Sequence, residues 1–186
     1  ISPDSQVALT LKIVCGFSVG EIARAFLSNE SSVTKLITRA KSRLRSGEIA
    51  FEMPAGDELS TRMTPVLKVL YLMFSEGYTP TSGSEVVRRD LCYEALRLAE
   101  HMTRDSKTTL PKTHALASLF CFHAARFSAR IGTEGEMLLL ADQDRTAWDG
   151  ELLHRGIKHL TASASGDELS DYHLEAEIAS IHSLAP

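Results

Sequence analysis

The stretch that decides the fold is "EIARAFLSNESSVTKLITRAK", from Glu21 to Lys41, which reads as two short helices interrupted by "SNESS". Ser18 and Glu21 match the capping-box pattern that opens a helix. After that helix, Ser28 or Asn29 can serve as the N-cap of a second one. A helix, a turn of three or four residues and another helix form the helix-turn-helix pattern, which this stretch therefore predicts.

Apolar residues at helical spacing predict how the two helices pack. The first helix presents Ile22 and Phe26 on one face, and the small side chain of Ala23 allows the second helix to cross closely over it. The second helix has apolar residues spaced by four, three and four, which places them on one inward face. These inward residues are Val33, Ile37, Ala40 and Leu44. The opposite face is left for solvent or a partner.

That opposite face is polar and basic, which indicates DNA binding. Short hydroxyl side chains and a lysine stand at the helix N-terminus, where the helix dipole favours phosphate and base edges are within reach of a major-groove helix. Lysines and arginines follow without an intervening acid, as expected for salt-dependent phosphate contacts. The candidate DNA-binding residues are Ser31, Ser32, Thr34, Lys35, Thr38, Arg39, Lys41 and Arg43. The alternative is an ordinary helical hairpin whose charges are solvated.

Charge is divided unevenly along the 186 residues. Residues 1–46 carry seven Lys and Arg against three Asp and Glu, a net charge of +4, whereas the remainder carries 13 against 21, a net charge of −8. A basic segment suits nucleic acid and an acidic one is repelled by it. Because residues 47–62 contain glycine and proline and few apolar runs, we expect a linker there. The predicted organisation is a helix-turn-helix module at 1–46, a linker at 47–62 and a helical domain at 63–186.

Helical periodicity predominates after the linker, so the predicted fold class is all-α, a helix-turn-helix module followed by a helical bundle that could be repeat-like. The segment "VLKVLYLMF" at 66–74 is apolar nearly all round and is expected to form a central buried helix. Further helices are expected at 85–102, from Pro111 onward, at about 146–164 and at 169–183. For residues 132–144 the sequence does not distinguish a strand from an extended segment.

The histidines, cysteines and acidic residues give no metal-binding or catalytic pattern. His154 and His159 are five residues apart, which does not place them on one helix face, and the acidic run at 142–149 lacks the EF-hand spacing. His123 is expected to be a hydrogen-bonded core residue and Trp148 a core anchor. The widely spaced Cys15, Cys92 and Cys121 are expected to be reduced, buried thiols. Without a nucleophile elbow, P-loop or dinucleotide motif, we expect no cofactor, no metal and no enzymatic activity.

Several long segments resemble bacterial extracytoplasmic-function (ECF) sigma factors. Residues 2–45, "SPDSQVALTLKIVCGFSVGEIARAFLSNESSVTKLITRAKSRLR", resemble region 4, which recognises the −35 promoter element. Four later segments resemble the helical C-terminal extension of one ECF sub-group: "VLYLMFSEGYTPTSG", "RRDLCYEALRLA", "LADQDRTAWD" and "YHLEAEIASIHS". The resemblance implies that the intact protein has an N-terminal region 2, which binds core polymerase and opens the −10 element; the chain starts at Ile1 and we expect it to be a fragment without region 2.

The resemblance also implies partners: promoter DNA at the −35 element and the β flap of core RNA polymerase. The flap would dock on the apolar first helices, near Leu9, Ile13 and Phe17. Two positions depart from the family pattern, since Leu27 stands where a glycine often follows the first helix and Leu36 where an arginine is common. The helical domain would bind an anti-sigma or other regulatory partner, sense a ligand, hold region 4 in check, or dock on polymerase.

An alternative function is a helix-turn-helix transcriptional regulator with a ligand-sensing or protein-interaction helical domain. A requirement for core polymerase separates the two functions. No stretch is long and apolar enough to cross a bilayer, and no basic-then-apolar leader is present, so we expect a cytoplasmic protein without a membrane partner.

Overall fold

The structure is a computed structural model that describes residues 1–47, 58–81 and 86–184. Within these residues the regular structure is helical, and the only β pairing is a single bridge between Ile131 and Met137. The predicted all-α class is therefore confirmed. The α-helices are α1 (Pro3–Ile13), α2 (Val19–Ala25), α3 (Glu30–Arg45), α4 (Glu58–Tyr78), α5 (Arg89–Met102), α6 (Pro111–Ala124), α7 (Gly150–Ser163) and α8 (Asp171–Leu184).

Local capping fixes the ends of the first three helices. Ser2 accepts a hydrogen bond from the Ser5 amide at the start of α1, and α2 opens with both halves of the capping box predicted for Ser18 and Glu21. Asn29 caps α3 by accepting from the Ser32 amide at 2.8 Å. The predicted helix-turn-helix spacing is thus present, with α2 and α3 separated by residues 26–29.

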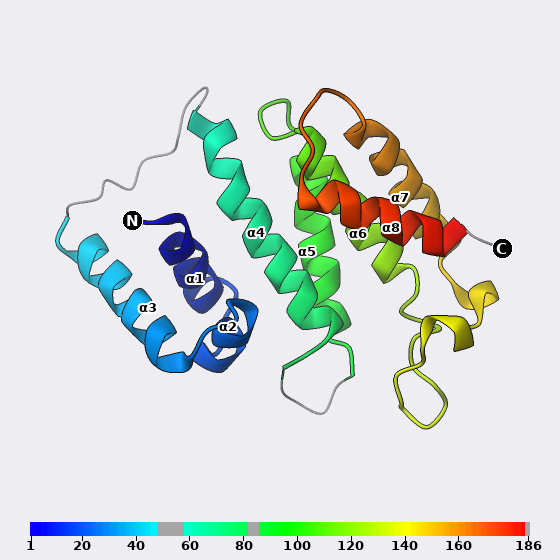
Figure 1. The fold of residues 1–186 in the computed structure, drawn as a ribbon, viewed down its shortest axis with the longest axis horizontal. Helices are drawn as coiled ribbons and strands as arrows, with labels where there is room; N and C mark the ends of the chain where they lie inside the picture. Colours follow the sequence, from blue (N-terminus) through cyan, green and yellow to red (C-terminus); the bar gives the residue numbers. More distant parts are fainter. Residues whose placement is uncertain (48–57, 82–85, 185–186) are drawn as a thin grey trace.

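Helix α4 lies in the middle of the molecule, with α1 to α3 on one side and α5 to α8 on the other (Figure 1). This position explains why 66–74 is apolar nearly all round, because α4 packs on α1 as well as on α5 and α6. Helix α4 begins at Glu58, so the last five residues of the predicted linker 47–62 are helical. Residues 48–57 of that linker lie outside the part of the chain that the structure describes.

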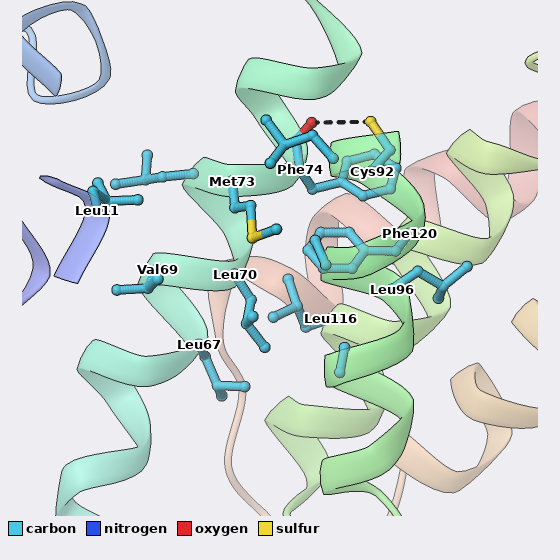
Figure 2. Close-up of a cluster of buried hydrophobic side chains, with 14 of the residues drawn as sticks. Leu11, Leu67, Val69, Leu70, Met73, Phe74, Cys92, Leu96, Leu116 and Phe120 are labelled. Carbon is cyan, nitrogen blue, oxygen red and sulfur yellow. Dashed lines mark hydrogen bonds between the residues drawn. The ribbon is translucent and has the colours of Figure 1, made fainter. Parts of the chain in front are cut away.

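One continuous cluster of buried apolar side chains runs from α1 through α4 to α6 (Figure 2). Leu11 of α1 and Leu67 of α4 are both fully buried in it. Phe74 of α4 stacks on Phe120 of α6 with ring centroids 4.2 Å apart. The Cys92 thiol donates to the Phe74 carbonyl oxygen at 3.4 Å. Helices α1 to α3 and the later helices therefore share one hydrophobic core.

The corner after α4 gives a structural reason for the segment "FSEGYT". A Cβ at Gly77 would lie 2.7 Å from the Cys92 sulfur, so α5 can approach only a glycine there. The buried Glu76 carboxylate accepts from the Thr81 amide at 2.7 Å and from the Thr81 hydroxyl at 2.5 Å. Arg130 stacks on the Tyr78 ring, 3.4 Å from its centroid, and also donates to the Tyr78 carbonyl. This segment is thus a junction between α4, α5 and the loop after α6.

The connection between α6 and α7 contains residues 132–144, for which a strand and an extended segment are the alternative predictions. It contains the isolated bridge, followed by 3₁₀ turns at Leu140–Asp142 and Arg145–Ala147. Helix α7 starts at Gly150, later than the predicted 146, because Asp149 caps it by accepting from the Glu151 and Leu152 amides. Trp148 is buried, as predicted.

The three cysteines are free thiols, as predicted, but only Cys92 and Cys121 are buried, while Cys15 is half-buried. None of the helices in the described ranges is both long and apolar enough to cross a bilayer.

Candidate nucleic-acid interface

The turn between α2 and α3 is built from backbone hydrogen bonds and one strained residue. The Leu27 amide donates to the Arg24 carbonyl at 3.0 Å, and the Ser28 amide to the Ala23 carbonyl at 2.8 Å. Leu27 itself has a φ of +49° and its side chain is 97% exposed. A left-handed backbone favours glycine, so Leu27 is a strained, solvated leucine at this turn.

The inward faces of α2 and α3 pack as predicted. Ile22 and Ala23 of α2 are buried, and so are Val33, Ile37 and Ala40 of α3. Phe26 and Leu44 are half-buried at the edges of this contact. Leu36, the second departure, is half-buried and packs against the core, so part of its side chain contributes to the contact between helices.

Except for Lys41, the candidate DNA-binding residues lie on the exposed side of α3. Within the described part of the chain, α3 packs only on α1 and α2, and α4 to α8 lie beyond α1 (Figure 1). Lys41 is half-buried and lines a groove of about 470 Å³ between α1 and the end of α3, so it is oriented less freely than the others. The exposed candidates are Ser31, Ser32, Thr34, Lys35, Thr38, Arg39 and Arg43.

The electrostatics of this face are those of an anion-binding surface. Helix α3 carries five Lys and Arg against the single acid Glu30. Among the described residues no salt bridge engages Lys35 or Arg39, so both charges are available to a partner. The N-terminus of a 16-residue helix adds a partial positive charge beside Ser31 and Ser32.

Two long-range contacts hold α1 and α2 against the rest of the molecule. Arg88, just before α5, pairs with Glu21 of α2 at 3.2 Å. Burial raises the pKa of Glu21, but hydrogen bonds from Ser18 and the Arg88 charge outweigh it and lower the pKa overall. Lys68 of α4 pairs with Asp4 at 3.1 Å and lies over the Phe26 ring, 5.2 Å from its centroid. Nothing in the sequence identifies these pairs, because their members are far apart along the chain.

The expected docking face on the first helices is only partly at the surface. Ile13 is 59% exposed and Leu9 is half-buried at the groove beside α3. Phe17 is 2% exposed, because its ring fills the core beneath α1 and α2. The prediction that Phe17 contributes to a docking surface is therefore wrong.

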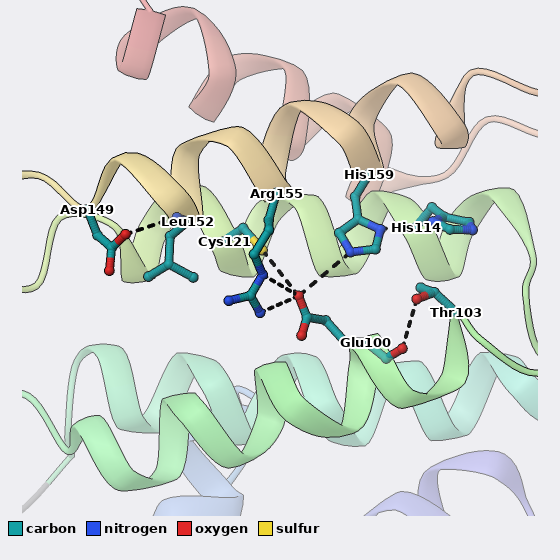
Figure 3. Close-up of polar contacts among 8 residues, drawn as sticks. All are labelled: Glu100, Thr103, His114, Cys121, Asp149, Leu152, Arg155 and His159. Carbon is teal, nitrogen blue, oxygen red and sulfur yellow. Dashed lines mark hydrogen bonds and ion pairs between the residues drawn. The ribbon is translucent and has the colours of Figure 1, made fainter.

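A second polar cluster joins α5, α6 and α7 (Figure 3). Glu100 Oε1 accepts from Arg155 Nε at 2.9 Å and lies 3.7 Å from His159 Nε2. On its other side, His159 Nδ1 meets His114 Nδ1 at 3.0 Å. Burial lowers the pKa of both histidines. Two facing nitrogens at this distance need one proton between them, so the pair is a neutral structural contact between α6 and α7.

His123 differs from its prediction as a hydrogen-bonded core residue. Its Nδ1 is sealed from solvent and has no hydrogen-bond partner among the residues that the structure describes. Burial first, and then the charges of Arg126 and Arg130, lowers the pKa of His123 to about 4. The ring is held instead by aromatic contacts, including Tyr78 at 4.9 Å between centroids.

Metal binding was not expected, and the structure gives no donor set for it within 1–47, 58–81 and 86–184. No group of three or more His, Cys, Asp or Glu side chains is positioned to hold an ion there. His154 is exposed, whereas His159 is half-buried in the Glu100 cluster.

Comparison with known proteins places most of the helical domain in one family. The profile of a family described as "Family of unknown function (DUF6596)" matches residues 62–164. An uncharacterized protein of Rhizobium meliloti (strain 1021) is 36% identical over 180 residues, which cover 97% of this chain and 42% of the relative. The chain thus spans about two fifths of that relative's length. No solved structure matches.

Proposed function

The chain belongs to the DUF6596 family, a family of unknown function, and we propose from the geometry of its own residues that it recognises promoter DNA as the region 4 part of an ECF sigma factor. In this proposal α3 enters the major groove at the −35 element. The single observation that carries it is the exposed outer face of α3. That face is polar and basic, and no described helix other than α1 and α2 packs on α3.

The positions along α3 suggest a division of roles. Ser31, Ser32 and Thr34 stand in the first turns, where short hydroxyls reach phosphates and base edges. Lys35 lies one turn further and would contact a base edge or a nearby phosphate. Arg39 and Arg43 follow at intervals of four residues on the same side and would contact the backbone, with Thr38 and Lys41 flanking them.

In this proposal α3 binds DNA directly, and the helical domain does not first have to move away from it. The net charge of −8 beyond residue 46 motivated the idea that the helical domain masks α3. In the described part of the chain, however, α4 to α8 make no packing contact with α3. The shared core instead suggests that the helical domain supports the helix-turn-helix mechanically, through α1 and α4.

The proposal is tested by charge reversal on α3. Fluorescence anisotropy with a labelled −35-like duplex should show that Lys35→Glu with Arg39→Glu abolishes binding. A matched control, Arg62→Glu with Lys107→Glu, changes the net charge equally at exposed positions on other elements and should retain most of the affinity. Equal binding by the α3 variant and the parent would show that another surface contacts DNA.

A helix-turn-helix regulator remains the second candidate, because the same face of α3 would serve it. The two differ in their need for polymerase. A sigma factor, in its full-length form with region 2, forms an open promoter complex only together with core polymerase, whereas a regulator occupies its operator alone. Footprinting of the full-length protein with and without core polymerase separates them.

A further inference from the structure

A separate cavity of about 280 Å³ lies between α4, α6 and α8, on the opposite side of α4 from the helix-turn-helix. Its volume is near the lower end of the range for small-molecule sites, about 300 to 1,000 Å³, so a ligand of one ring and a short chain is the appropriate size. The α4 wall belongs to the segment "VLYLMFSEGYT", which DNA binding does not explain. The principal lining residues are Tyr71, Phe74, Tyr78, Phe120, His123 and Glu175.

Aromatic rings form most of this wall. Phe74 stacks on Phe120, and its centroid lies 6.0 Å from that of Tyr78. Tyr71 adds a further ring, 5.6 Å from that of Tyr172 on α8. Such rings favour an apolar or aromatic ligand body, and their faces also attract cations.

The charged group of the cavity is the Glu175 carboxylate, which has no cationic partner among the described residues. It is half-buried and accepts a hydrogen bond from the Tyr71 hydroxyl at 3.0 Å. Burial raises the pKa of Glu175, the cost of removing a carboxylate from water without a counter-charge. Burial and the nearby Glu175 charge raise the pKa of Tyr71 to about 12, so its hydroxyl stays protonated and donates.

At the other end of the cavity, near Tyr78 and Thr79, a positive charge is already present. Arg130 covers the Tyr78 ring and donates to the Thr79 hydroxyl at 3.4 Å. His123 lines the wall as a neutral imidazole, and its sealed Nδ1 has no partner within the described ranges, so it does not repel a cation. The unmet negative charge is therefore confined to the end formed by Tyr71 and Glu175.

From this geometry we propose that the cavity binds a small protonated organic amine, with its ammonium group on Glu175 and its apolar body among the rings of Tyr71, Phe74 and Tyr78. The carboxylate gains the counter-charge that the chain does not provide, and the rings replace water around the organic body. The site is independent of DNA binding by α3, so either proposal can fail without the other.

Three probes of matched shape test the ligand class on the 186-residue chain. Phenethylamine carries a positive charge, 2-phenylethanol is neutral and phenylacetate is negative at pH 7. Isothermal titration and NMR chemical-shift mapping should give phenethylamine an affinity at least tenfold higher than 2-phenylethanol, with shifts centred on Tyr71 and Tyr78, and no binding of phenylacetate. Equal binding of all three, or no binding of phenethylamine at 10 mM, would overturn the proposal.

A pair of isosteric variants on one helix locates the charge. Glu175→Gln retains an acceptor for the Tyr71 hydroxyl but removes the carboxylate, so the preference for phenethylamine over 2-phenylethanol should disappear. Glu177→Gln makes the same charge change on the exposed side of α8 and should leave the preference intact. If both variants weaken phenethylamine equally, the amine binds only to the general acidic surface and the assigned site is wrong.

Discussion

Glu21 and Arg88 are 67 residues apart in sequence, yet their side chains pair at 3.2 Å and join α2 to the segment that opens α5. The same carboxylate accepts from the Ser18 amide at 2.6 Å, so one side chain both caps α2 and anchors it to the helical domain. The orientation of the helix-turn-helix therefore depends on a residue outside it.

This double role predicts separable effects of substitution. Arg88→Ala should reduce the free energy of unfolding by about 0.5 to 1 kcal/mol, since the pair is partly exposed. Glu21→Gln should cost a similar amount through the lost charge, while its side-chain oxygen still accepts from Ser18. Chemical denaturation of both single variants and the double variant gives the coupling energy. A coupling energy near zero would mean that the two side chains do not interact in solution.

The left-handed backbone at Leu27 predicts a stabilising substitution. A non-glycine residue in this conformation costs about 1 to 2 kcal/mol, whereas glycine adds about 0.5 to 1 kcal/mol of unfolded-state entropy. Leu27→Gly should therefore raise the free energy of unfolding by about 0.5 to 1 kcal/mol in a urea titration. Ser28→Gly, at the next exposed position without a positive φ, should lower it. A loss of stability in Leu27→Gly would contradict the strain at this turn.

The half-buried His123, whose Nδ1 is sealed from solvent, predicts a loss of stability in acid. Its folded pKa of about 4 lies below the unfolded value near 6.5, so the unfolded chain binds the proton first as the pH falls. The contribution of this residue is fully present above pH 6.5 and declines between pH 6.5 and 4, by roughly 3 kcal/mol in total.

Replacing the ring isolates that contribution. His123→Phe keeps the aromatic packing with Phe74 and Tyr78 and removes the unpartnered nitrogen, so its stability should fall less than the parent's over this range. His154→Phe, at an exposed position, should follow the parent's profile. Parallel curves for His123→Phe and the parent would show that His123 does not control the acid response.

The Glu100 cluster predicts a large effect for one carboxylate and a small effect for another. Glu100→Gln leaves Arg155 and His159 without their shared anionic partner, and should cost about 1 to 3 kcal/mol in the free energy of unfolding. Glu94→Gln breaks the exposed pair with Arg97, which is screened by solvent, and should have a much smaller effect. Thermal denaturation at pH 7 measures both variants. An equal loss of stability in the two would show that Glu100 contributes no more than an exposed surface charge.

Local sequence patterns were sufficient for the helices and for the exposed face of α3. Capping at Ser18 and Asn29, proline at the start of α6 and the spacing of Val33 and Ile37 are all short-range signals, and the structure confirms them. The same signals placed the candidate DNA-binding side chains on one helix, of which only Lys41 is held partly inward.

Features that depend on tertiary packing were not predictable in this way. Phe17 follows a helix-terminating glycine and resembles a surface loop residue, but the crossing of α1 and α2 encloses it. His123 is predicted to have a hydrogen-bond partner, yet its Nδ1 has none in the part of the chain that the structure describes. The cavity at Glu175 and the pair of Glu100 with Arg155 require helices distant in sequence to meet, and no local spacing encodes that.

The measurement that tests the central claim most directly is equilibrium binding of the chain to −35-like and scrambled duplexes across a salt series. The account predicts tighter binding to the −35-like duplex and a steep fall in affinity with salt, with the slope of log K against log salt reduced by about one when Arg39 is replaced by Ala. Equal affinity for both duplexes, or a slope unchanged in Arg39→Ala, would contradict the role of α3 as a promoter-reading helix.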